Sequence, residues 1–163
     1  MSVAQDIVAS YTKPRAVFRR RAGAETREDR ALVVLMAACL LIFVAQWPRL
    51  ARISFTTGDE LNPLLGGALF GWLFIAPLVL YAIGTLSHIL ARLMGGKGNA
   101  YRARFALFWA LLAASPLWLL WGIIAGYIGQ STGLSILGMI ALGAFIMIWA
   151  MGFLEAEWGE DTA

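Results

Sequence analysis

The sequence predicts an all-α, polytopic membrane protein: a bundle of about four transmembrane helices that follows an amphipathic, basic N-terminal segment. Two observations predict this class. Only 14% of the residues are charged and 60% are hydrophobic, whereas about a quarter of the residues of a soluble domain are charged. In addition, residues 105–154 contain no Asp, Glu, Lys or Arg. Because a helix of a soluble protein keeps one polar face, such a stretch indicates a membrane-embedded chain.

Residues 1–30 are predicted to form a cytoplasmic segment that lies on the membrane surface. Pro14 is well placed to begin a second helical turn, and arginines flank the apolar positions, which suits contact with an anionic leaflet. A solvated basic tail that only directs topology is the alternative. No cleavable signal peptide is expected, since the segment lacks an apolar run. The apolar residues recur at near-helical spacing: Val3, Ile7, Val8, Tyr11, Val17 and Phe18.

The membrane domain is predicted to cover residues 31–154. Residues 31–50 supply the roughly 20 apolar residues that one span requires. Residues 61–91 are uncharged but too few for two spans, so they predict one long or tilted helix at 64–90, kinked at Pro77. The sequence GYIGQSTG divides the long uncharged stretch. The last two spans are therefore expected at 105–125, with a kink at Pro116, and at 134–154.

The basic residues predict the orientation. With four spans, eleven of the thirteen fall on one side, and only Arg49 and Arg52 fall on the other. The positive-inside rule then puts both termini in the cytoplasm. The preference for arginine over lysine and the high alanine content are typical of a GC-rich bacterial genome, which predicts a bacterial inner membrane. Residues 155–163 are predicted to be an acidic, solvated cytoplasmic tail, with pairing to the basic N-terminal segment as the alternative.

The loop Gly95-Gly96-Lys97-Gly98 resembles a fragment of a phosphate-binding loop, but the sequence argues against a nucleotide site. A Walker-type loop needs G-x-x-x-x-G-K-[ST] after a strand, and here Ala91 and Gly98 occupy the first-glycine and hydroxyl positions. The glycines instead fit a helix C-terminus, and the nearby basic residues are expected to face lipid headgroups. The predicted headgroup-binding residues are Lys13, Arg15, Arg19, Arg20, Arg21, Lys97, Arg102 and Arg104.

Candidate polar sites are few. His88 is expected to cap the end of its span near the cytoplasmic face, with a proton-handling role as the alternative. Every acid is expected outside the spans, which argues against an ion or proton carrier. Asp59 and Glu60 are expected to form a helix cap or a salt bridge with nearby arginines rather than an acid–base pair. Cys39 is expected to be an inert buried thiol.

Two G-x-x-x-G motifs are candidate helix-packing sites. Gly67 and Gly71 lie in the second predicted span, and Gly122 and Gly126 lie in the third. Glycines at this spacing let two helix backbones approach closely. We expect packing within the bundle, and a contact with a second protein or a second copy is the alternative.

Three short stretches carry a family resemblance: YTKPRAVFRR, ARLMGGKG at the end of a long span, and ASP (with Ser115 and Pro116) inside the next. They resemble the bacterial branch of the Yip (Ypt-interacting-protein-like) family of multi-pass membrane proteins, whose members commonly have about five spans rather than four. The resemblance implies a non-catalytic protein that binds a partner protein or organises the membrane, with no cofactor, nucleotide or nucleic acid. The alternative is a small transporter or channel-like component, which helices interrupted at Pro77 and Pro116 would suit.

Overall fold

The computed structural model describes residues 2–23 and 25–159, and this part of the chain is all-α, as predicted. Four stretches are long and apolar enough to cross a membrane, which confirms the predicted number: residues 28–57, 61–93, 100–128 and 132–158. The helices are α1 (Val3–Ser10), α2 (Pro14–Ala22), α3 (Glu28–Thr57), α4 (Leu61–Phe70), the π-helical turn η1 (Gly71–Ile75), α5 (Ala76–Leu93), α6 (Ala100–Ile128) and α7 (Thr132–Trp158).

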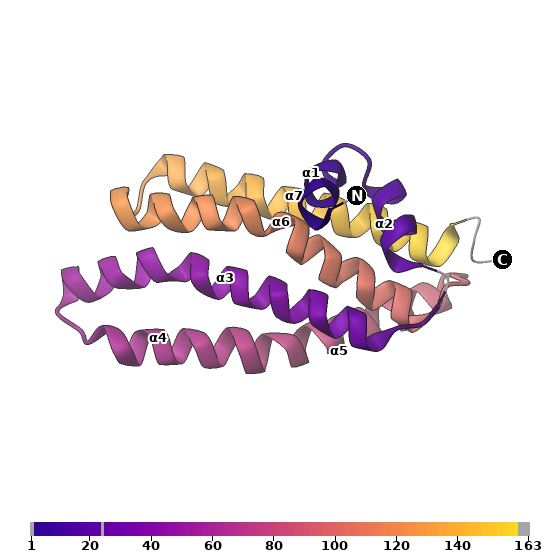
Figure 1. The fold of residues 1–163 in the computed structure, drawn as a ribbon, viewed down its shortest axis with the longest axis horizontal. Helices are drawn as coiled ribbons and strands as arrows, with labels where there is room; N and C mark the ends of the chain where they lie inside the picture. The colour runs from indigo at the N-terminus through magenta and orange to yellow at the C-terminus, as the bar shows by residue number, and fades with distance from the viewer. Residues whose placement is uncertain (1, 24, 160–163) are drawn as a thin grey trace.

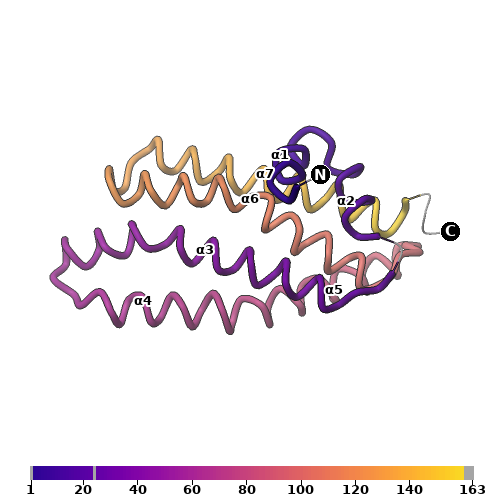
Figure 2. The backbone as a smooth tube through the Cα atoms, viewed as in Figure 1, coloured from indigo at the N-terminus to yellow at the C-terminus, as the bar shows by residue number. Residues whose placement is uncertain are grey.

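The long helices form an elongated bundle with α3 and α6 adjacent at its centre (Figures 1 and 2). The continuous helix α4–η1–α5 flanks α3, and α7 lies along α6. Because one span separates them, α3 and α6 run in the same direction, with Gly122 against Ala45 and Gly126 against Pro48. We call the end with α1, α2, the α5–α6 connection and the last turn of α7 the basic end. The far end carries the α3–α4 and α6–α7 connections.

The two prolines predicted to kink a span lie inside continuous helices. Pro77 is the second residue of α5, so the backbone adopts π-helical geometry in the turn just before the proline. Pro116 lies inside α6, and α6 changes direction near its middle in Figure 1. The spans with these two prolines, residues 61–93 and 100–128, both extend further at the basic end than the uncharged stretches 61–91 and 105–154 do.

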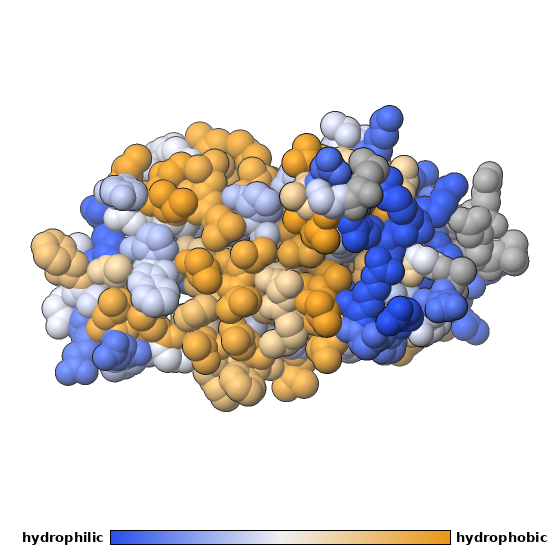
Figure 3. Space-filling model, in the orientation of Figure 1, coloured by the Kyte–Doolittle hydropathy of each residue, from blue (hydrophilic) through white to orange (hydrophobic). Residues whose placement is uncertain are grey.

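The hydrophobic core is concentrated toward the basic end. In the first half of α6, Phe105, Phe108 and Ala113 are fully buried, because α1, α2, α3, α5 and α7 all pack around this half. In the far half Leu120 and Ile123 are about half exposed. Figure 3 shows the corresponding band of apolar surface around the middle of the molecule, with hydrophilic side chains gathered at the basic end. This band is the surface expected to face lipid.

One of the two predicted glycine contacts is confirmed. A Cβ added at Gly122 would overlap the carbonyl oxygen of Ala45, and one at Gly126 would lie 2.5 Å from the Cβ of Pro48. These glycines allow α6 to approach α3. No heavy atom lies within 4 Å of a Cβ placed at Gly67 or Gly71, so the expected packing of this motif within the bundle is wrong. It fails because α4 touches α3 through other side chains and turns its glycines outward.

The expected role of the acids in the α3–α4 connection is also wrong. Glu60 is the N-cap of α4, but its side chain makes no capping hydrogen bond. The carboxylate of Asp59 accepts a hydrogen bond from the hydroxyl of Thr57 at 2.7 Å and caps no helix. Within the described chain, neither acid pairs with Arg49 or Arg52. The reason is that α3 continues to Thr57, which carries both acids past the arginines into solvent.

Candidate functional site

Helix α1 is amphipathic but faces the bundle with its polar side. Asp6 and Ser10, one turn apart, are 1% and 0% exposed, whereas Val8 on the opposite face is 70% exposed. A helix on the surface of a soluble domain has the reverse arrangement. The polar residues are satisfied by the bundle, and the outward face, which exposes Ala4, Gln5 and Val8, is left to the surroundings.

Asp6 is the centre of this inward contact. Its carboxylate forms ion pairs with Arg20 and Arg21 of α2, and the guanidinium of Arg21 also lies over the ring of Trp109, 5.3 Å from the ring centre. Burial alone would raise the pKa of Asp6. The hydrogen bond and charge of Arg21, followed by those of Arg20, outweigh burial and hold this pKa below its ordinary value of 3.8. Asp6 therefore stays ionised and ties α1 to α2.

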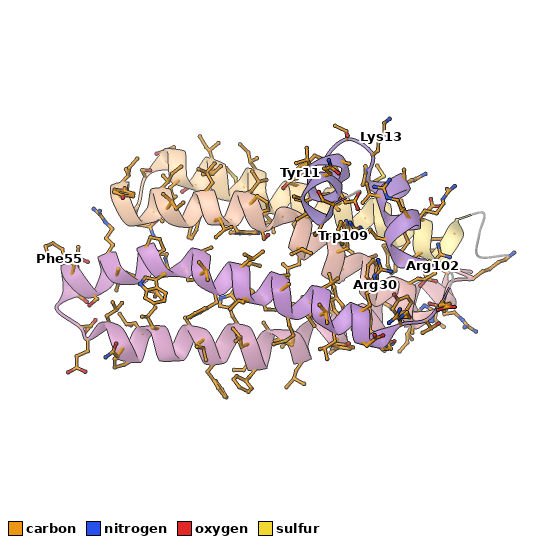
Figure 4. The ribbon with its side chains drawn as sticks, in the orientation of Figure 1. Tyr11, Lys13, Arg30, Phe55, Arg102 and Trp109 are labelled. Atoms are coloured by element: carbon orange, nitrogen blue, oxygen red, sulfur yellow. The ribbon has the colours of Figure 1, made fainter. Side chains whose placement is uncertain are left out.

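Two further hydrogen bonds fix α1 against α6. The indole N–H of Trp109 donates to the hydroxyl of Ser10 at 3.0 Å, and the hydroxyl of Tyr11 donates to the carbonyl of Ala113 at 2.7 Å. Figure 4 shows Tyr11 and Trp109 on facing elements of this contact. Since Pro116 follows three residues later in α6, the carbonyl of Ala113 lies in the turn where a proline interrupts the helical hydrogen-bond pattern.

Helix α2 packs its apolar residues into the bundle. Val17 and Phe18 are 2% and 1% exposed, and the Phe18 ring lies 6.3 Å from that of Phe105. The expectation that Val17 and Phe18 contact the lipid leaflet is therefore wrong. They are buried because they join the hydrophobic core formed with the first half of α6, and the guanidinium of Arg102 lies over the ring of Phe18 at 5.7 Å.

The outward face of α2 is basic. Lys13 and Arg15 are exposed, and Figure 4 shows Lys13 pointing away from the bundle. The side chains of Arg19 and Arg20 remain 49% and 46% exposed although each pairs with an acid. A shallow hollow on this face is lined by Arg15, Ala16, Arg19 and Arg20. Three residues of the predicted headgroup-binding set are thus brought together, and Lys13 lies directly before them in the chain.

The last turn of α7 contradicts the predicted solvated tail. The helix continues to Trp158, with Glu155 5% and Glu157 0% exposed. The carboxylate of Glu155 accepts a hydrogen bond from Nη2 of Arg19 at 2.6 Å. For Glu155, the alternative prediction, that the tail pairs with the basic N-terminal segment, is therefore the correct one. Helix formation through these residues carries both carboxylates back onto the bundle. Residues 160–163 of the predicted tail lie outside the described residues.

His88 has an acidic partner that the sequence did not suggest. Its Nδ1 lies 2.6 Å from Oε1 of Glu157, and the imidazole is largely buried. The expectation that no acid lies within reach of His88 is wrong, because α7 extends beyond the uncharged stretch used to delimit it. The second carboxylate oxygen of Glu157 is buried with no hydrogen-bond partner among the described residues.

The glycine loop between α5 and α6 packs on this end of α7. Gly95 has a φ of 90° just after the end of α5, which confirms its role as a helix stop. The backbone N–H of Lys97 donates to the carbonyl of Glu157 at 2.8 Å, and a Cβ at Gly98 would overlap the carbonyl of Ala156. The loop is therefore rich in glycine because it crosses a helix end closely. The Lys97 side chain is exposed.

The remaining predicted headgroup residue on α6, Arg104, is mostly occupied within the protein. It pairs with Glu28 at the start of α3, hydrogen-bonds to the hydroxyl of Thr85 at 3.3 Å, and lies over the ring of Tyr81. Its contact with Glu28 joins the first turns of α3 and α6. Arg104 and Lys97 lie apart from the basic face of α2, so the structure does not unite all eight predicted residues in one surface.

Asp6 and Glu157, the two most buried acids, are not among the residues predicted from the sequence. For Asp6 a signal was present: it lies four residues before Ser10, and a helical reading of this stretch puts Val8 on the opposite face. For Glu157 only the tertiary contact identifies the role. Within residues 2–23 and 25–159, no group of three or more His, Cys, Asp or Glu side chains is arranged to hold a metal ion.

Comparisons of the chain with family models, with curated proteins and with solved structures find no match. The Yip-like resemblance therefore stays a prediction. What the structure itself establishes is an all-α protein with four helices suited to cross a membrane, and a polar assembly at one end of them.

Proposed function

We propose that this protein is a non-catalytic integral membrane protein that organises the leaflet at its basic end. Helix α1 acts as a shallow wedge among the lipids, and the outward face of α2 binds anionic headgroups. The observation that carries the proposal is the inverted orientation of α1, with Asp6 buried and Val8 70% exposed. An outward Val8 is stable where the surroundings are acyl chains, as for helices that lie in the membrane interface.

The level of α1 along the bundle supports this reading. Tyr11 at the end of α1 bonds to Ala113, and at the far end Gly129 packs against Arg52. At about 1.5 Å per residue, α6 rises about 24 Å from Ala113 to Gly129. The hydrocarbon core of a bilayer is about 30 Å thick, and interfacial helices enter it by about 5–10 Å. If the far boundary of the hydrocarbon core lies at Arg52, the core extends slightly beyond Ala113. Helix α1 then lies at the near boundary, at the depth of an interfacial helix.

The charge of α2 completes the arrangement. Lys13 and Arg15 make no side-chain hydrogen bond or ion pair with the described residues, and Arg19 and Arg20 keep about half of their side chains exposed. Each basic residue close to an anionic leaflet contributes on the order of 1 kcal/mol of binding free energy, less at high salt. The buried side of α2 fixes these residues in one direction, so they bind without the cost of ordering a free tail.

Labelling at Val8 tests the wedge. We expect a Val8→Cys variant in proteoliposomes to react slowly with a water-soluble maleimide, and a nitroxide there to be relaxed by lipid-dissolved oxygen. The matched control is Arg15→Cys on the outward face of α2, at the level of the headgroups and their water, which should react at least about tenfold faster. Cys39 is fully buried and should stay unlabelled. Equal reaction rates at the two positions would show that α1 lies in water, and the proposal would be lost.

Orientation is the second part of the proposal. We infer that both termini are cytoplasmic, in a bacterial inner membrane, because eleven basic residues lie toward the basic end and two toward the far end. A reporter active only in the periplasm should be inactive when fused after Ala163 and active when inserted after Gly58. Activity of the fusion after Ala163 would reverse the proposed topology.

A small transporter is the second candidate, and the buried contact between His88 and Glu157 favours it. Buried ionisable pairs in membrane helices often serve proton or ion pathways. A pH-sensitive dye in proteoliposomes would report proton flux, which Glu157→Gln should abolish and the exposed-site variant Glu25→Gln should not.

Binding of a protein partner, as the Yip-like resemblance implies, is compatible with the proposed role and would be tested by co-purification in mild detergent.

A further inference from the structure

Arg52, near the end of α3, is held in one position at the far end of the bundle. Its Nη1 donates to the carbonyls of Gly126 and Tyr127 at 3.2 and 2.9 Å, which caps the last turn of α6. A Cβ at Gly129 would lie 2.7 Å from its Nε, and Gly129 has a φ of 78°, so glycine is required there on two grounds. The guanidinium therefore lies flat against the α6–α7 turn.

Neither arginine of the far end has an acidic partner among the described residues. Arg49 donates only to the side-chain amide of Gln46, at 3.3 Å, and Arg52 bonds only to backbone carbonyls. Asp59, the nearest acid after α3, is occupied by Thr57. Both arginines are partly buried. Two positive charges one turn apart, partly withdrawn from water and without an acidic partner, attract an anion from outside.

The surface next to these arginines has two hollows that meet at Arg52. One, of about 150 Å³, lies between α3 and the α6–α7 turn and is lined by Arg49, Arg52, Thr56 and Gln130 together with apolar residues. The side-chain amide of Gln130 makes no hydrogen bond to the described residues, so its N–H groups are available to an acceptor.

The second hollow is a groove between α3 and α6 and is mostly apolar. It is lined by Pro48, Ala51, Ile123, Tyr127 and the other side of Arg52. Gly126 forms its floor, at the place where α6 approaches Pro48 most closely. The groove runs along the band of apolar surface, so an acyl chain of the surrounding lipid can reach it directly.

We propose that the far end holds one anionic phospholipid of the opposite leaflet, with its phosphate between Arg49, Arg52 and Gln130 and an acyl chain in the groove beside Ile123. Guanidinium groups bind phosphate through paired, charge-assisted hydrogen bonds. The adjacent apolar groove favours a lipid over a free phosphate ion, which would leave it empty. The site is separate from the basic face of α2, because it lies at the other end of the bundle.

The site predicts a lipid that stays bound through purification. We expect native mass spectrometry of the full chain in detergent to show one retained phosphatidylglycerol, and retention of phosphatidylcholine to be much weaker. Arg49→Gln should lower the affinity for phosphatidylglycerol about tenfold, as for loss of one hydrogen bond between charged groups. The control Arg92→Gln, in the last turn of α5 at the basic end, should leave this lipid bound. Arg49 is chosen because Arg52 also caps α6.

A photoreactive acyl chain locates the lipid and separates this proposal from the one for the basic end. Crosslinks of phosphatidylglycerol to the peptide with Ile123 and Tyr127, lost in Arg49→Gln, would support the site. Crosslinks confined to α1 and α2 would overturn it and leave the wedge proposal standing. If millimolar inorganic phosphate displaces the bound phosphatidylglycerol and no crosslinks form, the site binds free anions rather than a lipid. If Arg49→Gln and the unaltered chain retain phosphatidylglycerol equally, the proposed site does not exist.

Discussion

Replacing Gly122 with alanine should lower the thermal unfolding midpoint, whereas the same change at Gly67 should not. The added methyl at position 122 overlaps the carbonyl oxygen of Ala45, so α6 has to move away from α3. Overpacking of this kind costs about 1–3 kcal/mol, and the upper end applies because the obstacle is backbone rather than a flexible side chain. The loss also exceeds the roughly 1 kcal/mol that Gly→Ala gains in helix propensity.

Gly67→Ala is a matched control, since it changes the same residue type in the same motif of another span. No atom lies within 4 Å of its added Cβ, so only the gain in helix propensity remains and the midpoint should stay constant or rise. Circular dichroism in one detergent measures both variants. Equal destabilisation would mean that Gly67 faces a second copy or a partner, which was the alternative drawn from the sequence.

Replacing Asp6 with alanine should release α1 while α2 and the four long helices remain in place. Removal of the carboxylate leaves Arg21, whose side chain is only 17% exposed, without its partner. Breaking a buried ion pair costs about 3–5 kcal/mol, and a value of roughly 3 kcal/mol is expected because Arg20 is half exposed. A spin label at Val8→Cys should become mobile. Asp29→Ala, which breaks the exposed pair with Arg27, is the control and should leave the label immobile.

Acid should have the same effect as Asp6→Ala. The pKa of Asp6 is held below 3.8 in the folded protein, so its ion pairs stabilise the docked state at pH values above about 4. This contribution is lost as the pH falls through the folded-state pKa. The spin label should therefore gain mobility only below about pH 4, and an Asp6→Asn variant should be mobile at neutral pH as well. A label that is immobile in Asp6→Asn would show that other contacts hold α1.

The sequence alone determined the class of the fold and the number of spans. The uncharged stretch 105–154 and the apolar residues before it fix where helices can cross a bilayer, because burial of a charge in hydrocarbon is costly at any position. The helix stop at Gly95 and the close approach at Gly122 and Gly126 were also readable, since each depends on local backbone geometry. Their sequence spacing carries that information directly.

Only the tertiary structure decided which polar residues meet. Asp6 and Arg21, Arg19 and Glu155, and His88 and Glu157 are distant in the chain, and the sequence contains no spacing that relates them. The same holds for the outcome at Gly67, whose motif is as regular as that of Gly122. Whether a glycine or a carboxylate finds a partner depends on how neighbouring helices rotate about their axes, and this rotation is set by packing of the whole bundle. For this reason the contacts that bury Asp6, on which the proposed function rests, became visible only in three dimensions.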